Sequence, residues 1–598
     1  MRQNNLTAWT YSEQLNCLLF FAQRMDELLF HHTTDTYRYS TLSIRGLVGE
    51  YCTVYRNVKS GIINRKNLTH IIEEFTHRLQ HDDIAKEILS AEYVDRFIKN
   101  YGSWNEKNQY ENLRYIGRKL GNKVYYHHIV NRLKFLIAEN NQKKEIDEKT
   151  ALFVRELLDC GYNENYIYQV LHEVFFHRPV SSLSSLDEFF SKFDFAERKF
   201  DVYIGYSNDI SSLFPLFGKL KVSDLNVSIV DFDSIPKGIK TKRQKTILKF
   251  EAIESCDMYS AFEIADALSA CVVNSYAFFR HDPFAMRTYG QVIDENQRIT
   301  TLRPKQLLKY RVSALSHLAS TQNAEFLIAI LFENYDNLST FSKITRIHNR
   351  AIYSENTSDS LLSLWSILES IVEEDDCNDN SDDTTKAEKK ERSKIGNIIA
   401  YILPYLKSTY IQKIVQTCMA DIIRWNDTFF KDHVANNGFG NNDLEHTFAF
   451  LAFDSTKTDR EKLYSEIDKY PLLRYRVYTL SEQLHNSKKI KALINNHTQR
   501  VKWHLYRIYR ARNYIVHDAS ENEGLNQELV INLHSYVDIL FSKVIEIINN
   551  SPYEDSISDA LTGHKLAVQI MDEKLDKQKD EYITPENALR YFYYDFEK

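Results

Sequence analysis

Apolar residues recur at three- and four-residue spacing along most of the chain, which is the pattern of amphipathic helices. Within residues 1–195 this spacing is clear over 15–29, 68–89 and 126–138, and the interruptions between these segments are short and polar. No segment repeats at a fixed period, so a regular solenoid is not indicated. The sequence predicts a helical N-terminal domain over residues 1–195, which is a candidate for a sensor or regulatory region.

The pattern changes between residues 196 and 300. Residues 199–206, 226–232 and 246–253 are rich in Val, Ile, Phe and Tyr, as strands are, and a helix is expected at 258–271, ahead of an apolar run. The sequence predicts a small α/β module here.

Helical spacing returns over residues 301–550. One charged segment interrupts it, residues 373–392, which carries seven acidic residues in its first eleven and then a run of Lys and Arg. Such a segment is expected to be a solvated loop, with a docking role for a partner as the alternative. Residues 551–598 form an acidic tail with an aromatic ending, which we expect to dock on the fold of its own chain. The predicted fold class is mainly α.

Composition supports this fold class. The 598 residues include only 16 Gly and 9 Pro, so a sandwich or barrel with many hairpins is not expected. The net charge of −7 excludes a uniformly basic coat for nucleic acid. Seven scattered cysteines, no N-terminal leader pattern and no apolar run of membrane-spanning length predict a cytoplasmic protein without a membrane partner.

Four common phosphate-binding, catalytic and metal-binding motifs are missing from the sequence. There is no P-loop, G-x-G-x-x-G, G-x-S-x-G or C-x-x-C pattern. His172 and His177 are five residues apart instead of the four that a helical zinc site needs, and the adjacent His127 and His128 point about 100° apart on a helix. We therefore expect no metal and no cofactor.

A basic, aromatic stretch is the main chemical feature. Residues 474–512 carry ten Lys or Arg and one acidic residue, Glu482, and five aromatic residues lie among them: Tyr475, Tyr478, Trp503, Tyr506 and Tyr509. Cationic groups beside aromatic rings suit single-stranded nucleic acid. Arg500, Lys502 and Arg507 are the candidate RNA-binding residues. The alternative is a helix with an aromatic core face and a basic solvent face.

The end of this stretch reads Arg512-Asn513-Tyr514-Ile515-Val516-His517, or R-N-x-x-x-H. It resembles the R-x(4–6)-H signature of the HEPN ribonucleases, in which Asn, Asp or His commonly follows the arginine. A second similarity precedes it, because residues 344–356 and 358–375 resemble the first helix and the LWxxLE helix of Apea-like HEPN domains. Together the two similarities cover residues 320–550.

The resemblance implies a helical HEPN bundle and a homodimer in which two such helices line one cleft. It implies a metal-independent endoribonuclease that leaves 2′,3′-cyclic phosphate and 5′-OH ends. It further implies a role in anti-phage defence, abortive infection or as a toxin, with a phage-derived or nucleotide trigger. A toxic nuclease must be silent by default, so residues 1–300 are candidates for its restraint. A non-catalytic HEPN protein that binds nucleotide or RNA is the alternative.

The residue types agree with that chemistry. His517 is suited to proton transfer near neutral pH, Arg512 to neutralising a phosphate, and Asn513 to positioning either group. Arg510 is seven residues before His517 and shares its helix face. Glu369 lies at the edge of an apolar helix face, where a carboxylate is costly unless paired, so we expect it to orient Arg512 or another arginine. The alternatives are that His517 caps the helix end and that Glu369 faces solvent.

Overall fold

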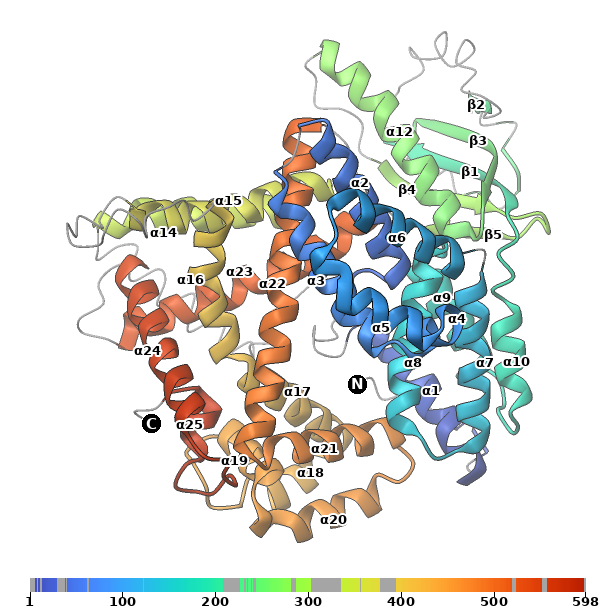
Figure 1. Ribbon diagram of the computed structural model, residues 1–598. Helices are drawn as coiled ribbons and strands as arrows, with labels where there is room; N and C mark the ends of the chain where they lie inside the picture. The colour runs from blue at the N-terminus through green and yellow to red at the C-terminus, as the bar shows by residue number, and fades with distance from the viewer. Residues whose placement is uncertain are drawn as a thin grey trace. The chain divides into compact units, whose positions relative to one another are not determined.

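The computed structural model is mainly helical, with one small sheet (Figure 1). It describes residues 6–595 apart from gaps. The residues outside the description are 1–5, 8, 11–12, 30–37, 39, 62–63, 122, 208–225, 231–232, 234, 238, 240–243, 281–286, 303–334, 355, 377–393, 519–522, 551–556 and 596–598. The chain forms two compact units, one containing residues 4–30 and 129–305, the other residues 1–3, 31–128 and 306–598.

The first unit combines helices with the sheet. Its helices are α1 (Asn16–Leu28), the greater part of α7 (Val124–Glu139), α8 (Lys143–Asp159), α9 (Glu164–Phe175), α10 (Ser184–Ser191) and α12 (Met258–Arg280). Its strands are β1 (Arg198–Tyr206), β2 (Asn226–Ile229), β3 (Thr246–Ser255), β4 (Arg287–Ile293) and β5 (Ile299–Leu302).

The sheet is antiparallel throughout, in the order β2-β3-β1-β4-β5. Helix α12 covers one face, where Ala261, Phe262 and Ala265 join the buried strand residues (Figure 1). Gly290 of β4 permits this packing, because a Cβ there would lie 2.1 Å from the Phe262 ring. The three predicted strands are present. The prediction missed β4 and β5, and α12 continues nine residues beyond the predicted end at residue 271.

The second unit begins with five helices, α2 (Ile44–Lys59), α3 (Lys66–His81), α4 (Asp83–Leu89), α5 (Ala91–Asn100) and α6 (Glu106–Leu120). The predicted helical segment 68–89 is therefore two helices. Asp82 separates them, since its backbone is extended and its side chain accepts a hydrogen bond from the Ala85 N–H, as an N-cap does. The predicted boundary at 195 also differs from the compact units, because residues 31–128 belong with the C-terminal helices.

The remaining helices of this unit follow residue 334. They are α14 (Tyr335–Tyr353), α15 (Thr357–Asp376), α16 (Lys394–Ser408), α17 (Tyr410–Trp425), α18 (Asp427–Phe429), α19 (Asp443–Ala452), α20 (Lys457–Glu466), α21 (Pro471–Leu484), α22 (Ser487–Asp518), α23 (Glu523–Asn550), α24 (Ile557–Lys577) and α25 (Ala588–Tyr593). Helix α15 extends into the predicted charged loop as far as Asp376, and residues 377–393 lie outside the described residues.

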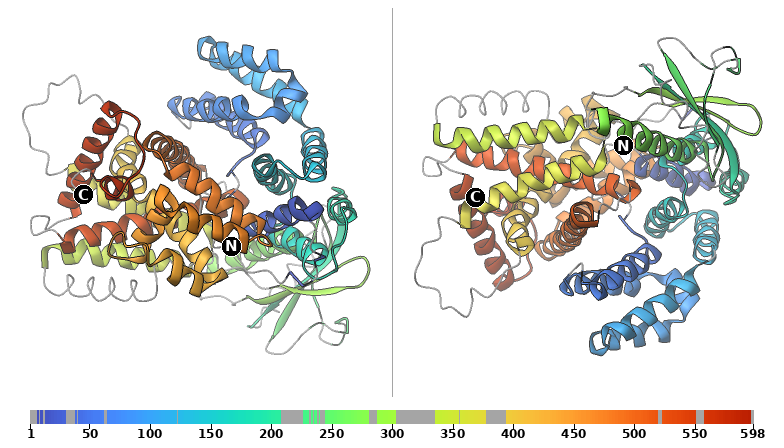
Figure 2. Two further views of the ribbon diagram at one scale, coloured as in Figure 1. Left: turned by 90° about the horizontal axis from the view of Figure 1, so that it is seen from below. Right: turned by 90° about the horizontal axis from the view of Figure 1, so that it is seen from above.

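Helix α22, with 32 residues, joins two hydrophobic cores of this unit. Ile490 and Ile494, near its start, pack with helices α17, α19 and α21. Val501, Leu505 and Ile508 pack with α14, α15, α16 and α23. Figure 1 shows the helix in orange, running between these two groups, and in both views of Figure 2 the yellow-green helices α14 and α15 lie beside α23.

The C-terminal tail packs on its own chain. Tyr591, Phe592 and Tyr594 are buried in the same core as α17 and α19, which agrees with the docking expected of the aromatic ending. In the part of the chain that the structure describes, no helix has both the length and the apolar character needed to cross a lipid bilayer.

Candidate functional site

The sequence motif lies at the C-terminal end of α22. Arg512 and Asn513 are both partly exposed on this helix. The backbone of His517 belongs to the last turn of the helix, while its side chain is outside the described residues. The regular helix places Asn513 and His517 one turn apart on one face. The structure thus positions the motif backbone, and the side chains of Arg512 and Asn513, on a single rigid element.

Packing against α15 fixes the orientation of this end of α22. Ile508 and Ala511 are buried in one core with Leu364, Trp365 and Leu368 of α15. The Trp365 ring also lies 5.8 Å from the Tyr509 ring, centroid to centroid. Both helices present apolar residues at helical spacing, and these two faces pack against each other.

Glu369 and Arg512 meet at the edge of this packed face. Arg512 Nη2 lies 3.6 Å from Glu369 Oε1, and the same oxygen accepts a hydrogen bond of 3.1 Å from Trp365 Nε1. Arg512 Nη1 donates a hydrogen bond of 3.2 Å to Asn513 Oδ1. Glu369 is therefore paired as the sequence analysis expected, and the solvent-facing alternative does not describe it.

The guanidinium of Arg512 is oriented by Glu369 and Asn513 and is also partly exposed to solvent. Its side chain is 25% exposed, against 16% for Glu369. A guanidinium donates hydrogen bonds in a fixed plane and binds phosphate through two of them. With a carboxylate on one side and solvent on another, Arg512 can bind a phosphate oxygen without a rearrangement of the fold.

Arg507 and Arg510 have a different environment. Arg507 Nη2 lies 2.5 Å from Glu74 of α3 and 3.1 Å from Glu50 of α2, and Arg510 Nη2 lies 2.8 Å from Glu50. The two arginine side chains are 1% and 3% exposed. We call these four residues the acid clamp. The predicted contact of Arg507 with RNA is corrected here, because its charged group faces two carboxylates and not solvent.

The acid clamp is strongly coupled. Burial raises the pKa of Glu74, but the charges of Arg507 and Arg78 outweigh burial and lower that pKa to about 2. Burial likewise opposes ionisation of Glu50, and Arg507 and Arg510 bring its pKa below the usual value. Both carboxylates are consequently ionised at neutral pH, and their attraction holds α2 and α3 on α22.

The aromatic residues of the basic stretch pack against protein. The Tyr506 ring stacks on His70 with centroids 3.4 Å apart, and the Trp503 ring lies 5.3 Å from His77. Burial, with the charges of Arg510 and Lys502, lowers the pKa of His70 to about 4. Trp503, Tyr506 and Tyr509 therefore match the core-face alternative and not an open platform for bases. Tyr478 of α21 differs, since it is 55% exposed.

Arg500 and Lys502, two of the predicted RNA-binding residues, are partly exposed on α22. Arg500 Nη2 lies 3.4 Å from His497 Nδ1.

Other histidines lie in ion pairs. His172 Nε2 is 2.6 Å from Asp26 Oδ1, and His128 Nδ1 is 3.7 Å from Glu87 Oε2.

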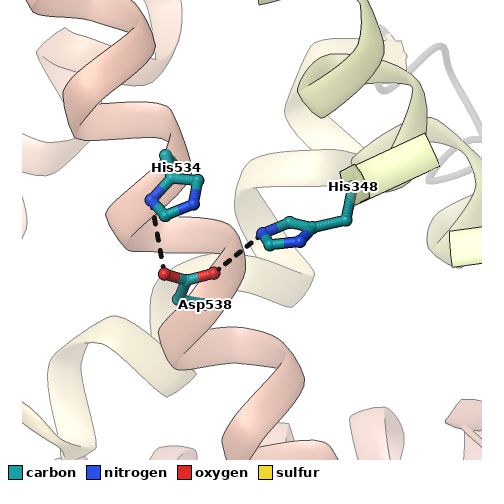
Figure 3. A group of neighbouring side chains, drawn as sticks. All are labelled: His348, His534 and Asp538. Carbon is teal, nitrogen blue, oxygen red and sulfur yellow. Dashed lines mark hydrogen bonds and ion pairs between the residues drawn. The ribbon is translucent and has the colours of Figure 1, made fainter. Parts of the chain in front are cut away.

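Three residues that the sequence analysis overlooked come together elsewhere in the second unit. His348 of α14 and His534 and Asp538 of α23 place their ligand atoms within 4.8 Å of one another (Figure 3). A local signal existed, because His534 and Asp538 are four residues apart and so share a helix face. Their partner, His348, lies 190 residues before Asp538 in the sequence, and a local sequence pattern cannot show that residues so far apart are in contact.

No protein-family model, no curated protein and no solved structure matches this chain.

Proposed function

We propose that the protein is a metal-independent endoribonuclease of HEPN type that acts in the cytoplasm in anti-phage defence or as a toxin. The observation that carries the proposal is the cluster of Glu369, Arg512 and Asn513 on two packed helices, with His517 one turn beyond Asn513. The HEPN resemblance assigns Arg512, Asn513 and His517 to the site, and Glu369 was expected to orient Arg512 because an unpaired carboxylate at that position is costly.

The proposed reaction uses the RNA as its own nucleophile. His517 takes the proton of the 2′-OH or gives a proton to the departing 5′-oxygen. The 2′-oxygen forms a bond to phosphorus as the bond to the 5′-oxygen breaks, which yields a 2′,3′-cyclic phosphate and a 5′-OH. Arg512 neutralises charge on the phosphorane, and Asn513 orients the phosphate or the histidine.

The proposal includes a homodimer in which the ends of two α22 helices line one cleft. Val516, within the motif, is 49% exposed and would face this cleft. Each copy would then supply one Arg512 and one His517 to a shared site.

We assign restraint of this nuclease to the acid clamp. Glu50 and Glu74 occupy the guanidiniums of Arg507 and Arg510 and cover that face of α22. Arg507 Nη1 and Arg510 Nε and Nη1 are buried and have no hydrogen-bond partner among the described residues. A nucleotide or phage-derived trigger that moves α2 and α3 could satisfy these donors.

RNA cleavage by the purified full-length chain tests the proposal. Wild type recovered from cells that have met phage, in which the proposed restraint is released, should cut single-stranded RNA in the presence of EDTA and leave cyclic phosphate ends. His517→Ala should abolish cleavage, and a substrate with one 2′-deoxy nucleotide at the cut position should resist cleavage there. His446→Ala is the control, since His446 pairs with Asp443 on α19 and is not part of the proposed site.

The outcomes separate the two candidate functions. Cleavage that persists in His517→Ala, or that stops in EDTA, contradicts the proposed mechanism. RNA binding by a wild type that never cleaves, including when cells that express it meet phage, would favour the non-catalytic binding and assembly protein.

A further inference from the structure

We propose that His348, His534 and Asp538 form a binding site for one divalent transition-metal ion, with Zn²⁺ as the first candidate. The site is separate from the proposed nuclease residues. It ties α14 to α23 in the helical bundle that also contains α15 and α22.

The three side chains place their ligand atoms close together. His348 Nε2 lies 3.1 Å from one oxygen of Asp538, and His534 Nδ1 lies 3.3 Å from the other (Figure 3). Two ligand atoms on a tetrahedral zinc ion, with bonds of about 2.0–2.1 Å, are about 3.3 Å apart. The two histidine–aspartate separations are close to this value, and all three ligand atoms lie within 4.8 Å of one another, so small side-chain rotations would direct the three groups at one ion.

The ligand set has the chemistry of a transition-metal site. Two imidazole nitrogens and one carboxylate oxygen suit Zn²⁺ and its neighbours, whereas Ca²⁺ and Mg²⁺ prefer oxygen ligands alone. The His348 and His534 rings stack with centroids 5.1 Å apart and an angle of 23° between their planes. Stacked rings held on two different helices are already ordered, so little conformational entropy is lost on metal binding.

The site is partly exposed to solvent, so a fourth ligand can reach the ion. The side chain of His534 is 8% exposed, while His348 and Asp538 are 25% and 23% exposed. One side of the site is thus closed by protein and the other meets solvent, which allows a water molecule to complete the coordination of the ion.

Another histidine–aspartate pair in the same unit lacks these features. His433 Nδ1 lies 3.1 Å from Asp459, but Lys462 Nζ lies 2.6 Å from the other ring nitrogen. An ammonium group at that distance repels a metal cation. Among the described residues, the His348 group is the one in which three ligand side chains converge.

Metal titration of the full-length chain, first stripped with a chelator, tests the inference. Zn²⁺ should bind with a stoichiometry of one per chain by calorimetry, and should raise the unfolding temperature. Co²⁺ should give the visible absorption of a four-coordinate site with nitrogen and oxygen ligands. His348→Gln and Asp538→Asn should each weaken Zn²⁺ binding more than about 100-fold, since even loss of a supporting residue around a metal costs 10–100-fold.

His433→Gln is the matched control and should bind Zn²⁺ as wild type does. Circular dichroism of the metal-free variants establishes that they are folded. Absence of a one-to-one Zn²⁺ complex in wild type, or equal affinity in wild type and His348→Gln, would overturn the inference and leave a histidine–carboxylate hydrogen-bond network. Neither result depends on RNA cleavage, so failure of this site is distinguishable from failure of the proposed nuclease.

Discussion

Two groups of arginines on one helix differ in what surrounds them. Arg507 and Arg510 are buried against Glu50 and Glu74, whereas Arg512, two residues beyond Arg510 on α22, keeps a quarter of its side chain in solvent beside Glu369. Both groups pair with carboxylates. The difference is that α2 and α3 cover the first group, while the pairing of Arg512 comes from α15 and leaves one side open.

The comparison teaches that sequence spacing does not decide which arginine can reach a ligand. Removal of one partner of a buried ion pair leaves an uncompensated buried charge and is strongly destabilising. A partly exposed pair contributes less to stability and can exchange its partner for a phosphate. We expect stability to depend on Arg507 and cleavage to depend on Arg512.

The largest expected effect is that of Arg507→Met. The substitution keeps an apolar stem but leaves Glu74 and Glu50 buried without their main partner, which should cost about 3–5 kcal/mol. Amide hydrogen exchange in α22, α2 and α3 measures this as a lower free energy of opening. Arg512→Met is the matched control and should cost less than about 1 kcal/mol. Equal losses of opening free energy in the two variants would show that the buried pair and the partly exposed pair stabilise the fold to the same extent.

Acid should lower the opening free energy of α22 by somewhat less than the Arg507→Met substitution does. The folded pKa of Glu74 is about 2, below the unfolded value near 4.5, so its contribution is present above pH 4.5 and is lost as pH falls towards 2. A shift of this size corresponds to at most about 3 kcal/mol. The measurement is the opening free energy of α22 from pH 6 to pH 3. Wild type should lose more than Arg507→Met, in which the stabilising charge is gone; parallel decreases would contradict the coupling.

The next effect concerns Arg512 itself. Arg512→Met should lower kcat for RNA cleavage about 100-fold, because the lost guanidinium stabilises charge that develops on the phosphorane. Arg512→Lys should recover part of the rate, since it restores the charge without the planar geometry. Rapid-quench cleavage assays measure both rates, and circular dichroism should stay helical. A cleavage rate unchanged in Arg512→Met would remove this residue from the mechanism.

The helices of this site could be predicted because local patterns specify them. The spacing of Leu361, Leu364 and Leu368 predicts the face of α15, and the cost of an unpaired carboxylate on the edge of that face directs attention to Glu369. The structure brings Glu369 and Arg512 together, and residues 344–356 and 358–375 largely coincide with α14 and α15.

The acid clamp could not be predicted, since its partners are far apart in sequence. Glu50 and Glu74 precede Arg507 by 457 and 433 residues, and nothing local marks either glutamate as buried. Strands β4 and β5 were missed for a related reason. RTYGQVI and ITTL are polar enough to resemble loops, and they become strands through pairing with β1 and with each other.

Glu369→Gln should have a smaller effect than loss of Arg512. Glutamine can still accept the hydrogen bond from Trp365, but it no longer attracts the guanidinium, so the orientation of Arg512 is loosened. We expect kcat to fall about 10-fold, with KM unchanged, because the interaction matters when charge develops. In an Arg512→Met background the same substitution should have no further effect. A further 10-fold loss there would mean that Glu369 acts independently of Arg512.

The smallest expected effect is that of Lys502→Ala, which extends the comparison along α22. Lys502 is partly exposed, so its ammonium can approach the RNA backbone, whereas Arg507 remains within the acid clamp. Loss of one phosphate contact should weaken RNA binding a few-fold and reduce the slope of log affinity against log salt concentration by about 1. Fluorescence anisotropy over a salt series measures this slope with His517→Ala protein, which should bind RNA without cutting it. Arg507→Met should leave the slope unchanged while α22 stays folded. If Arg507→Met lowered the slope and Lys502→Ala did not, the buried arginine would be the one that contacts RNA, and the acid clamp would have to open on binding.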